Sequence, residues 1–157
     1  MNKQQLTLRA VLGVALLSGC VAIEAKPPNC AQPLGKWNDE VKSVIEIKTY
    51  DTATGAISGE YTSRSGAGSW PMVGWINSAP AESSAPGKAG KGDHADVFTL
   101  MVRWGDRGSV TAWTGTCTVN PQSGLAQIST LWHTSRPNTG VEWDHTLTGS
   151  EVLVPIE

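Results

Sequence analysis

The strongest constraint on the fold of this sequence is its series of short strand-like segments, which turn residues separate from one another. From residue 35 onward, no stretch repeats its apolar residues with the period of a helix. Short runs of β-branched and aromatic residues are instead interrupted by Gly, Asn, Asp and Pro, as in 51–55 and 120–124. The pattern predicts eight strands, over Leu34–Asp39, Val44–Tyr50, Ile57–Ser63, Pro71–Ile76, Val97–Trp104, Ser109–Val119, Leu125–Thr134 and Asp144–Pro155.

Most connections between these segments are short, which favours antiparallel pairing of successive strands. Eight such strands suit a closed barrel, because closure leaves no exposed edge and encloses enough space for one small ligand. We therefore expect an all-β domain over residues 34–157, an eight-stranded antiparallel up-and-down β-barrel, with a two-sheet sandwich as the alternative. One connection is long: residues 77–96 are rich in Ala, Ser, Pro, Gly and Lys, and we expect a surface loop there.

The segment 108–117 has two unlike faces. Ser109, Thr111 and Trp113 share one of them, because successive side chains of a strand point to opposite sides. A polar face in water would explain this strand alone, but similar faces recur along the chain. They comprise Trp37 and Asp39; Gly59, Tyr61 and Ser63; Thr130, Trp132 and Thr134; and Leu147, Gly149, Glu151 and Leu153, whereas Leu100, Val102 and Trp104 lack a polar member. Since buried polar groups without partners cost free energy, this repetition predicts a ligand cavity. The seven Trp against one Phe agree with it.

The first 20 residues are typical of an export signal. Lys3 and Arg9 precede an apolar run at 10–17. The run is shorter than the ~20 residues of a membrane-spanning helix. The run ends in Leu-Ser-Gly-Cys20, which resembles the lipobox of bacterial lipoproteins, whose cysteine is lipidated and becomes the mature N-terminus. We expect an exported protein, either a periplasmic or outer-membrane lipoprotein or a secreted one, with membrane contact only through lipid on Cys20. Ordinary cleavage a few residues later is the alternative.

The remaining cysteines indicate a disulfide, and the net charge argues against a nucleic-acid partner. Residues 21–33 read as an N-terminal tether, and with Cys20 modified, Cys30 and Cys117 form the one pair available for a disulfide in an exported chain. Removing Lys3 and Arg9 with the leader reduces the 12 basic residues to 10, against 14 acidic ones, for a net charge of −4. This balance, with its scattered basic residues, predicts no nucleic-acid partner.

No pattern in the sequence predicts catalysis or a metal site. His133 and His145 fall at outward positions, His94 lies in the long loop, and no His-Glu-x-x-His or clustered-cysteine motif is present. Neither Cys20 nor Cys117 has a recognisable histidine partner for nucleophilic chemistry. We therefore expect a binding protein without catalytic residues, metal or cofactor.

A series of short motifs resembles the avidin/streptavidin family. In order, they are Gly35-Lys36-Trp37, Ser43, Gly59-Glu60-Tyr61-Thr62-Ser63, Val102-Arg103-Trp104, Ser109-x-Thr111-Ala112-Trp113-Thr114-Gly115, Thr130-Leu131-Trp132 and Trp143. Their order and spacing match over about residues 30–153, and Cys30 and Cys117 occupy the positions of the single disulfide of avidin. The resemblance implies an eight-stranded barrel that binds biotin at its open end.

The resemblance also assigns a role to each matching residue. Trp104, Trp113 and Trp132 would line the ring system and aliphatic chain of biotin. Ser43 and Tyr61 would donate hydrogen bonds to the ureido oxygen, Ser63 would accept one from a ureido N–H, and Thr111 would meet the sulfur. Ser109 and the backbone near Ala67, with Ser65 beside it, would hold the carboxylate. Trp143 would enter the pocket of a neighbouring subunit, which implies a homo-oligomer, a tetramer with a dimer as the alternative.

Two positions depart from the family pattern. Asp39 stands where the family has an Asn that donates to the ureido oxygen, and an ionised Asp can only accept. A protonated Asp39, or a shift of register that presents Asn38, is the alternative. Glu151 stands where the family has Asp or Asn, so that its longer side chain keeps the acceptor but changes its reach. Two carboxylates in one pocket should raise the pKa of at least one of them. We expect biotin binding weaker than in the tightest members; the alternative is a barrel that binds another small ligand, a sugar or a peptide, or inhibits a secreted protease.

Overall fold

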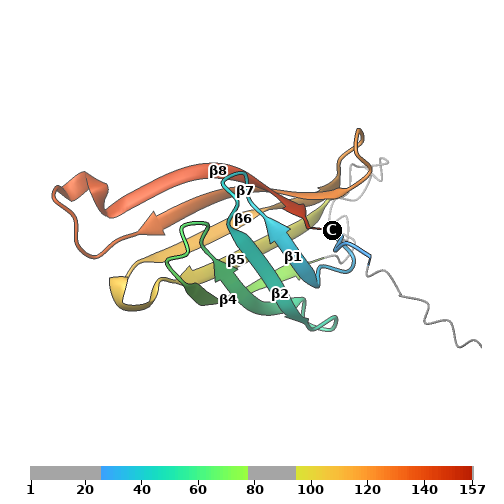
Figure 1. Ribbon diagram of the computed structural model, residues 1–157, viewed down its shortest axis with the longest axis horizontal. Helices are drawn as coiled ribbons and strands as arrows, with labels where there is room; N and C mark the ends of the chain where they lie inside the picture. Colours follow the sequence, from blue (N-terminus) through green and yellow to red (C-terminus); the bar gives the residue numbers. More distant parts are fainter. Residues whose placement is uncertain (1–25, 78–94, 157) are drawn as a thin grey trace, which may run out of the picture.

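The computed structural model of the protein describes residues 26–77 and 95–156 (Figure 1). Its strands are β1 (Gly35–Asn38), β2 (Val44–Tyr50), β3 (Ala56–Thr62), β4 (Ser69–Asn77), β5 (Asp96–Arg103), β6 (Val110–Val119), β7 (Ala126–Ser135) and β8 (Thr146–Pro155), with short 3-10 helices η1 (Gly105–Arg107) and η2 (Glu142–His145). The predicted leader over 1–20, the lipid site at Cys20 and the loop residue His94 lie outside the described residues.

The strands form one closed antiparallel barrel in sequence order, which confirms the expected fold and excludes the sandwich. Each strand pairs with the next, and β8 returns to pair with β1. This last contact is the shortest in the barrel, because only Trp37 with Pro155 and Asn38 with Val154 are in register. The earlier part of β8 therefore lies beside the β1–β2 turn without strand pairing to β1.

The predicted strands match the observed ones apart from their ends. The fourth strand begins at Ser69 instead of Pro71, and it includes Pro71 as its third residue. The eighth begins at Thr146, because the two preceding residues of the predicted strand belong to η2. Leu147, expected to face inward, is 39% exposed, since it lies where the β7–β8 hairpin extends beyond the other loops (Figure 1).

The apolar core fills the end of the barrel that holds the N-terminal segment. Its inward side chains include Ile47, Ile57, Ile76, Phe98, Ile128 and Leu153, all buried. The segment 26–33 packs against this end: Pro28 and Pro33 are buried, and the indole N–H of Trp37 donates to the carbonyl of Pro33 at 3.0 Å. A disulfide between Cys30 and Cys117 joins the segment to β6, with the Cα atoms 5.6 Å apart, as the sequence predicted.

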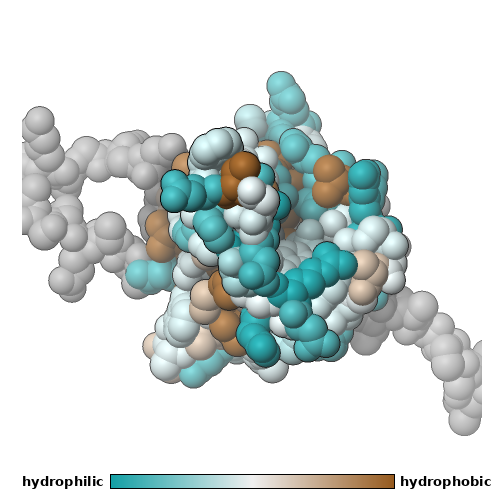
Figure 2. Space-filling view, turned by 90° about the vertical axis from the view of Figure 1, so that its left-hand side faces the viewer, coloured by the Kyte–Doolittle hydropathy of each residue, from teal (hydrophilic) through white to brown (hydrophobic). Residues whose placement is uncertain are grey.

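The opposite end of the barrel is open. Four connections meet there, those over residues 39–43, 63–68, 104–109 and 136–145, on the left in Figure 1. Figure 2, which views the barrel from this end, shows a hollow near its centre. No helix among the described residues is long and apolar enough to cross a membrane.

Candidate functional site

A cavity of about 310 Å³ opens at this end of the barrel. The side chains that line it come from the ends of the strands and from the β1–β2 turn. They are Asp39, Glu40, Val41, Tyr61, Trp104, Thr111, Trp113, Trp132, Thr134, Ser150 and Glu151. Seven of the residues that the sequence singled out are therefore brought to one space: Asp39, Tyr61, Trp104, Thr111, Trp113, Trp132 and Glu151.

Aromatic rings form one wall of the cavity. Tyr61 stacks on Trp113 at a centroid distance of 5.7 Å and meets Trp104 edge-on at 5.1 Å. Trp104 also meets Trp70 edge-on at 5.0 Å. Because such ring pairs add about 0.5–1.5 kcal/mol beyond the area they bury, the wall holds its own geometry. Trp70 was not predicted as part of it, since the sequence interpretation began the fourth strand one residue later.

Trp132 reaches the cavity across a glycine. It pairs in register with Trp113 on β6 and with Gly149 on β8. A Cβ added at Gly149 would lie 2.5 Å from the nearest atom of the Trp132 ring. The absence of a side chain at this position therefore allows the indole to pack directly against the backbone of β8 while it lines the cavity.

Asp39, the first of the polar side chains that line the cavity, is 1% exposed. One carboxylate oxygen accepts from the backbone N–H of Ser43 at 2.7 Å, and the other accepts from the hydroxyl of Tyr61 at 3.4 Å. The first bond closes the β1–β2 turn, which explains why a residue outside a strand is held inside the barrel. Both oxygens act as acceptors, the pattern of a carboxylate rather than of an amide.

The hydroxyl of Tyr61 is held in its neutral form. Burial raises the pKa of Tyr61 to about 12; a hydrogen bond with Ser43 opposes the shift, and the nearby charges of Asp39 and Glu151 add to it. A phenol with so high a pKa remains an O–H donor throughout the physiological range. Tyr61 can therefore donate its single proton either to Asp39 or to an acceptor in the cavity.

Glu151 faces the cavity from β8. Its carboxylate accepts a short hydrogen bond from the indole N–H of Trp113. Burial raises the pKa of Glu151 above its usual range, the bond from Trp113 opposes the shift, and the charges of Asp39 and Glu40 add to it. The expectation that one of the two carboxylates has a raised pKa is confirmed for Glu151, although burial is a larger cause than the second charge.

Two hydroxyls complete the cavity on the side of β6 and β7. Thr111 accepts from the indole N–H of Trp104 at 2.6 Å, and its oxygen lies 2.6 Å from that of Thr134. These bonds fix the orientation of the Trp104 ring. Strand parity had placed Thr134 on the inward face beside Trp132, but no motif of the resemblance included it.

The other predicted site residues lie around the cavity without lining it. Ser43 is buried beside Asp39 and Tyr61, its backbone N–H bonded to Asp39 and its side chain to Tyr61. Ser63 and Ser65, with oxygens 2.9 Å apart, lie with Ala67 in the exposed β3–β4 turn, and Ser109 precedes β6 at the same end. Trp143 lies in η2 at the tip of the β7–β8 hairpin, 79% exposed. The lining residues Glu40, Val41 and Ser150 were missed, because turn residues have no parity and Ser150 has outward parity.

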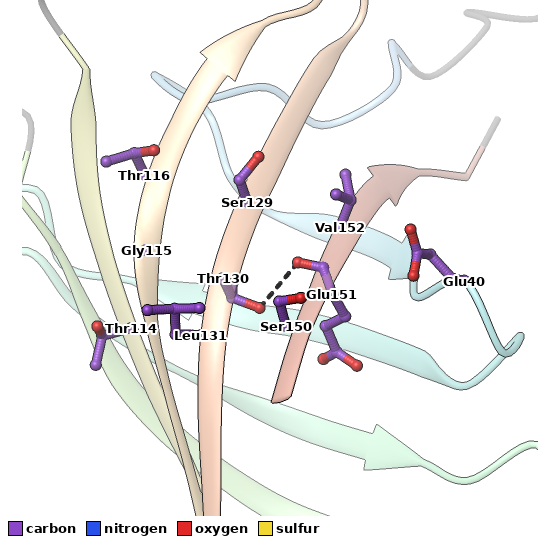
Figure 3. A pocket seen from close by; sticks show the side chains of 10 residues that line it. All are labelled: Glu40, Thr114, Gly115, Thr116, Ser129, Thr130, Leu131, Ser150, Glu151 and Val152. Carbon is purple, nitrogen blue, oxygen red and sulfur yellow. Dashed lines mark hydrogen bonds between the residues drawn. The ribbon is translucent and has the colours of Figure 1, made fainter. Parts of the chain in front are cut away.

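A second, larger cavity of about 390 Å³ lies against the outer faces of β6, β7 and β8 (Figure 3). It is lined by Glu40, Thr114, Gly115, Thr116, Ser129, Thr130, Leu131, Ser150, Glu151 and Val152. The hydroxyl of Thr130 donates to the backbone carbonyl of Glu151 at 3.1 Å, the dashed line in Figure 3. This cavity shares Glu40, Ser150 and Glu151 with the first, but it lacks the aromatic wall, so the smaller cavity is the candidate ligand site.

Metal chemistry finds no support in the described part of the chain. No group of three or more His, Cys, Asp or Glu side chains there is placed to hold a metal ion. His133 is exposed on the outer face of β7, as its parity predicted, and His145 is exposed in η2, where strand parity does not apply. A ring nitrogen of His145 lies 2.7 Å from the carbonyl of Arg136, which ties η2 to the end of β7.

The family model described as Avidin family matches residues 27–156. No curated protein matches the sequence. Among solved structures, xenavidin is 23% identical, with a TM-score of 0.60 over 78% of this chain and 96% of that one. The biotin binding protein from chicken is 24% identical, with a TM-score of 0.59 over 78% and 96%. Core-bradavidin is 22% identical, with a TM-score of 0.58 over 77% and 97%. These structural likenesses show the same barrel fold.

Proposed function

Because this chain belongs to the avidin family, a non-enzymatic family of biotin-binding proteins, we propose that it binds biotin in the open end of its barrel and leaves it chemically unchanged. The observation that carries the proposal is the convergence of aromatic and polar side chains on one cavity. Tyr61, Trp104, Trp113 and Trp132 line the same space as Asp39, Thr111 and Glu151. A volume of about 310 Å³ suits a small ligand.

Biotin has an apolar bicycle, a polar ureido group and a distant carboxylate. In the proposed complex the indoles of Trp104, Trp113 and Trp132 contact the bicycle and the aliphatic chain. Tyr61 and Ser43 donate to the ureido oxygen, supported by the raised pKa of Tyr61, which keeps its proton in place. Preformed ring contacts reduce the ordering cost of binding.

The remaining contacts extend from the two ureido N–H groups to the carboxylate at the mouth of the cavity. Thr111 meets the sulfur, and Ser63 accepts from one ureido N–H while Glu151 accepts from the other. Ser109, Ser65 and the backbone at Ala67 receive the carboxylate, in keeping with their position in the turns at the open end. Asp39 lowers the affinity for biotin, because its oxygen lone pairs face the ureido oxygen, where an amide would donate.

We also propose that the protein is a homo-oligomer, a tetramer or a dimer. Apolar side chains are exposed on the outer faces of three strands: Val73 and Trp75 on β4, Val97 and Met101 on the adjacent β5, and Leu131, which is 69% exposed, on β7. Val73 and Met101 are directly paired. Together with the exposed Trp143 these residues suit contact with further copies of the chain. Light scattering on the purified protein tests this, and the mass of a single chain at micromolar concentration would contradict it.

The protein is proposed to act outside the cytoplasm. The disulfide between Cys30 and Cys117 supports this, because such bonds persist in oxidising compartments. Lipid on Cys20 would then hold the protein at a membrane surface. Mass spectrometry of the mature N-terminus tests the anchor: a lipid-modified chain that begins at Cys20 is expected, and an unmodified chain that begins after it would contradict it.

The binding proposal is tested by tryptophan fluorescence. Biotin should shift or quench the emission of the chain with saturation, since three indoles line the cavity. Trp132→Phe should weaken the apparent affinity by about tenfold, because truncating a Trp that carries binding energy typically costs more than about 1 kcal/mol. Trp75→Phe is the matched control, since Trp75 is 53% exposed on the outer face of β4. Equal affinity of the two variants would contradict the proposed site.

A further inference from the structure

The candidate cavity carries a negative charge that the uncharged ureido head of biotin does not use. Three carboxylates line it, those of Asp39, Glu40 and Glu151, and the other lining residues are aromatic, aliphatic or hydroxyl-bearing. No Lys, Arg or His belongs to the lining. Among the described residues these carboxylates take part in no ion pair, since the recorded pairs join Lys48 to Glu46 and Glu60, and Arg136 to Asp144.

The inner end of the cavity presents an acceptor. Both oxygens of Asp39 already accept hydrogen bonds, from Ser43 and Tyr61, and an ionised carboxylate has lone pairs for about two more. A carbonyl oxygen placed against Asp39 would bring two acceptors together. An N–H donor in the same place would gain a charge-assisted hydrogen bond, which is about twice as strong as a neutral one.

The side of the cavity formed by β8 has the same preference. One carboxylate oxygen of Glu151 accepts a hydrogen bond from the indole N–H of Trp113, and the carboxylate still has lone pairs that can accept from a ligand. Burial and the charges of Asp39 and Glu40 disfavour the ionised form of Glu151. A cationic ligand nearby would therefore stabilise the ionised carboxylate. The carboxylates of Asp39 and Glu151 have already lost part of their hydration in the folded protein, which lowers the additional cost of pairing them with a cation.

The aromatic wall favours the same ligand charge. The rings of Tyr61, Trp104 and Trp113 lie within 6.5 Å of one another by centroid, and their faces carry negative partial charge. A cation against such faces gains about 0.5–2 kcal/mol, more for a flat guanidinium that can also stack. A flat cation between carboxylates and rings therefore fits both walls of the cavity.

We propose that this cavity prefers a ligand whose polar head is a cyclic guanidinium over one whose head is a cyclic urea. The inference rests on the proposed function, because it concerns the same site. The exocyclic NH₂⁺ replaces the ureido oxygen and donates to Asp39, a ring N–H donates to Glu151, and the apolar body lies against the indoles. Asp39 is then the residue that sets specificity for the head group.

The test compares two probes that differ only in the head, biotin and its guanidine analogue 2-iminobiotin. A guanidine is protonated at pH 7, as the side chain of arginine is. Titration calorimetry at pH 7 with the full chain should give a dissociation constant at least about tenfold lower for the analogue. Asp39→Asn should reduce this preference at least tenfold, since the amide can donate to the ureido oxygen, and thermal melting verifies that the variant is folded. Asp106→Asn is the matched control, because Asp106 is exposed in η1 and does not line the cavity.

Each outcome separates the inference from the proposed function. If biotin binds as tightly as the analogue or more tightly, the inference fails and biotin binding stands. If the analogue binds and biotin does not, the inference stands and biotin is not the ligand. If neither binds, both fail. If Asp106→Asn changes the preference as much as Asp39→Asn does, long-range charge explains it and the assignment to Asp39 is overturned.

Discussion

Reduction of the disulfide should remove much of the stability of the barrel. Cys30 and Cys117 are separated by 87 residues, and closing a loop of that size in the unfolded chain corresponds to about 4.6 kcal/mol at 25 °C. The bond also holds the segment 26–33, whose buried Pro28 and Pro33 cover the end of the barrel that carries the core. For a domain of this size the loss should lower the melting temperature by roughly 15 °C.

The measurement is urea-induced unfolding of the same chain with the disulfide oxidised and reduced. This pair leaves every side chain in place, whereas replacement of both cysteines by Ala would also create a cavity at Cys117, which is buried. We expect the free energy of unfolding to fall by about 2–5 kcal/mol on reduction. A difference below about 1 kcal/mol would refute the reasoning, because the bond would then constrain little of the unfolded chain.

The pocket carries two further predictions. Because the pKa of Glu151 is raised in the folded state, the folded chain holds this proton more tightly than the unfolded chain does. Protonation of Glu151 therefore contributes to stability. The contribution is complete below the unfolded pKa of about 4.3 and is lost as the pH rises through the folded pKa. Glu151→Gln should therefore gain stability relative to the parent as the pH rises above the unfolded pKa, and urea midpoints whose difference stays constant over that rise would contradict the shift. Tyr61, with a pKa of about 12, should remain un-ionised while an ordinary tyrosine titrates. The absorbance titrations at 295 nm of the parent and Tyr61→Phe should coincide up to about pH 11, and a missing step near pH 10 in the variant would show that Tyr61 is not buried as described.

The barrel was predictable because alternation and turn chemistry act locally. The segment 108–117 showed its two faces directly, and in the structure Thr111 and Trp113 are buried while Val110 and Thr114 are exposed. Turn residues such as those over 51–55 separate the strands because they favour compact reversals of the chain. The family resemblance then placed most of the aromatic wall.

The parts that were missed depend on contacts between distant segments. Trp70 was left out because Pro71 was interpreted as the start of a strand, whereas β4 begins at Ser69. Glu40 and Val41 belong to a turn, so their inward position follows from the bond between Asp39 and Ser43 and from no sequence period. Alternation can show that a side chain points inward, but not which partner it meets there.

The two departures from the family pattern acquired specific partners in the structure. Asp39 accepts from Tyr61 and from the backbone of Ser43, and Glu151 accepts from Trp113. Both carboxylates therefore have structural reasons to be present even before a ligand binds. They also make the cavity rich in hydrogen-bond acceptors. The number of donors on the head group of a ligand should therefore determine how tightly it binds.

Direct calorimetric titration of the purified chain with biotin tests the central claim most directly. The cavity is formed within one chain, so we expect saturable binding at micromolar biotin with one ligand per chain. The absence of both heat and saturation at micromolar concentrations would contradict the proposal that this barrel is a biotin-binding protein.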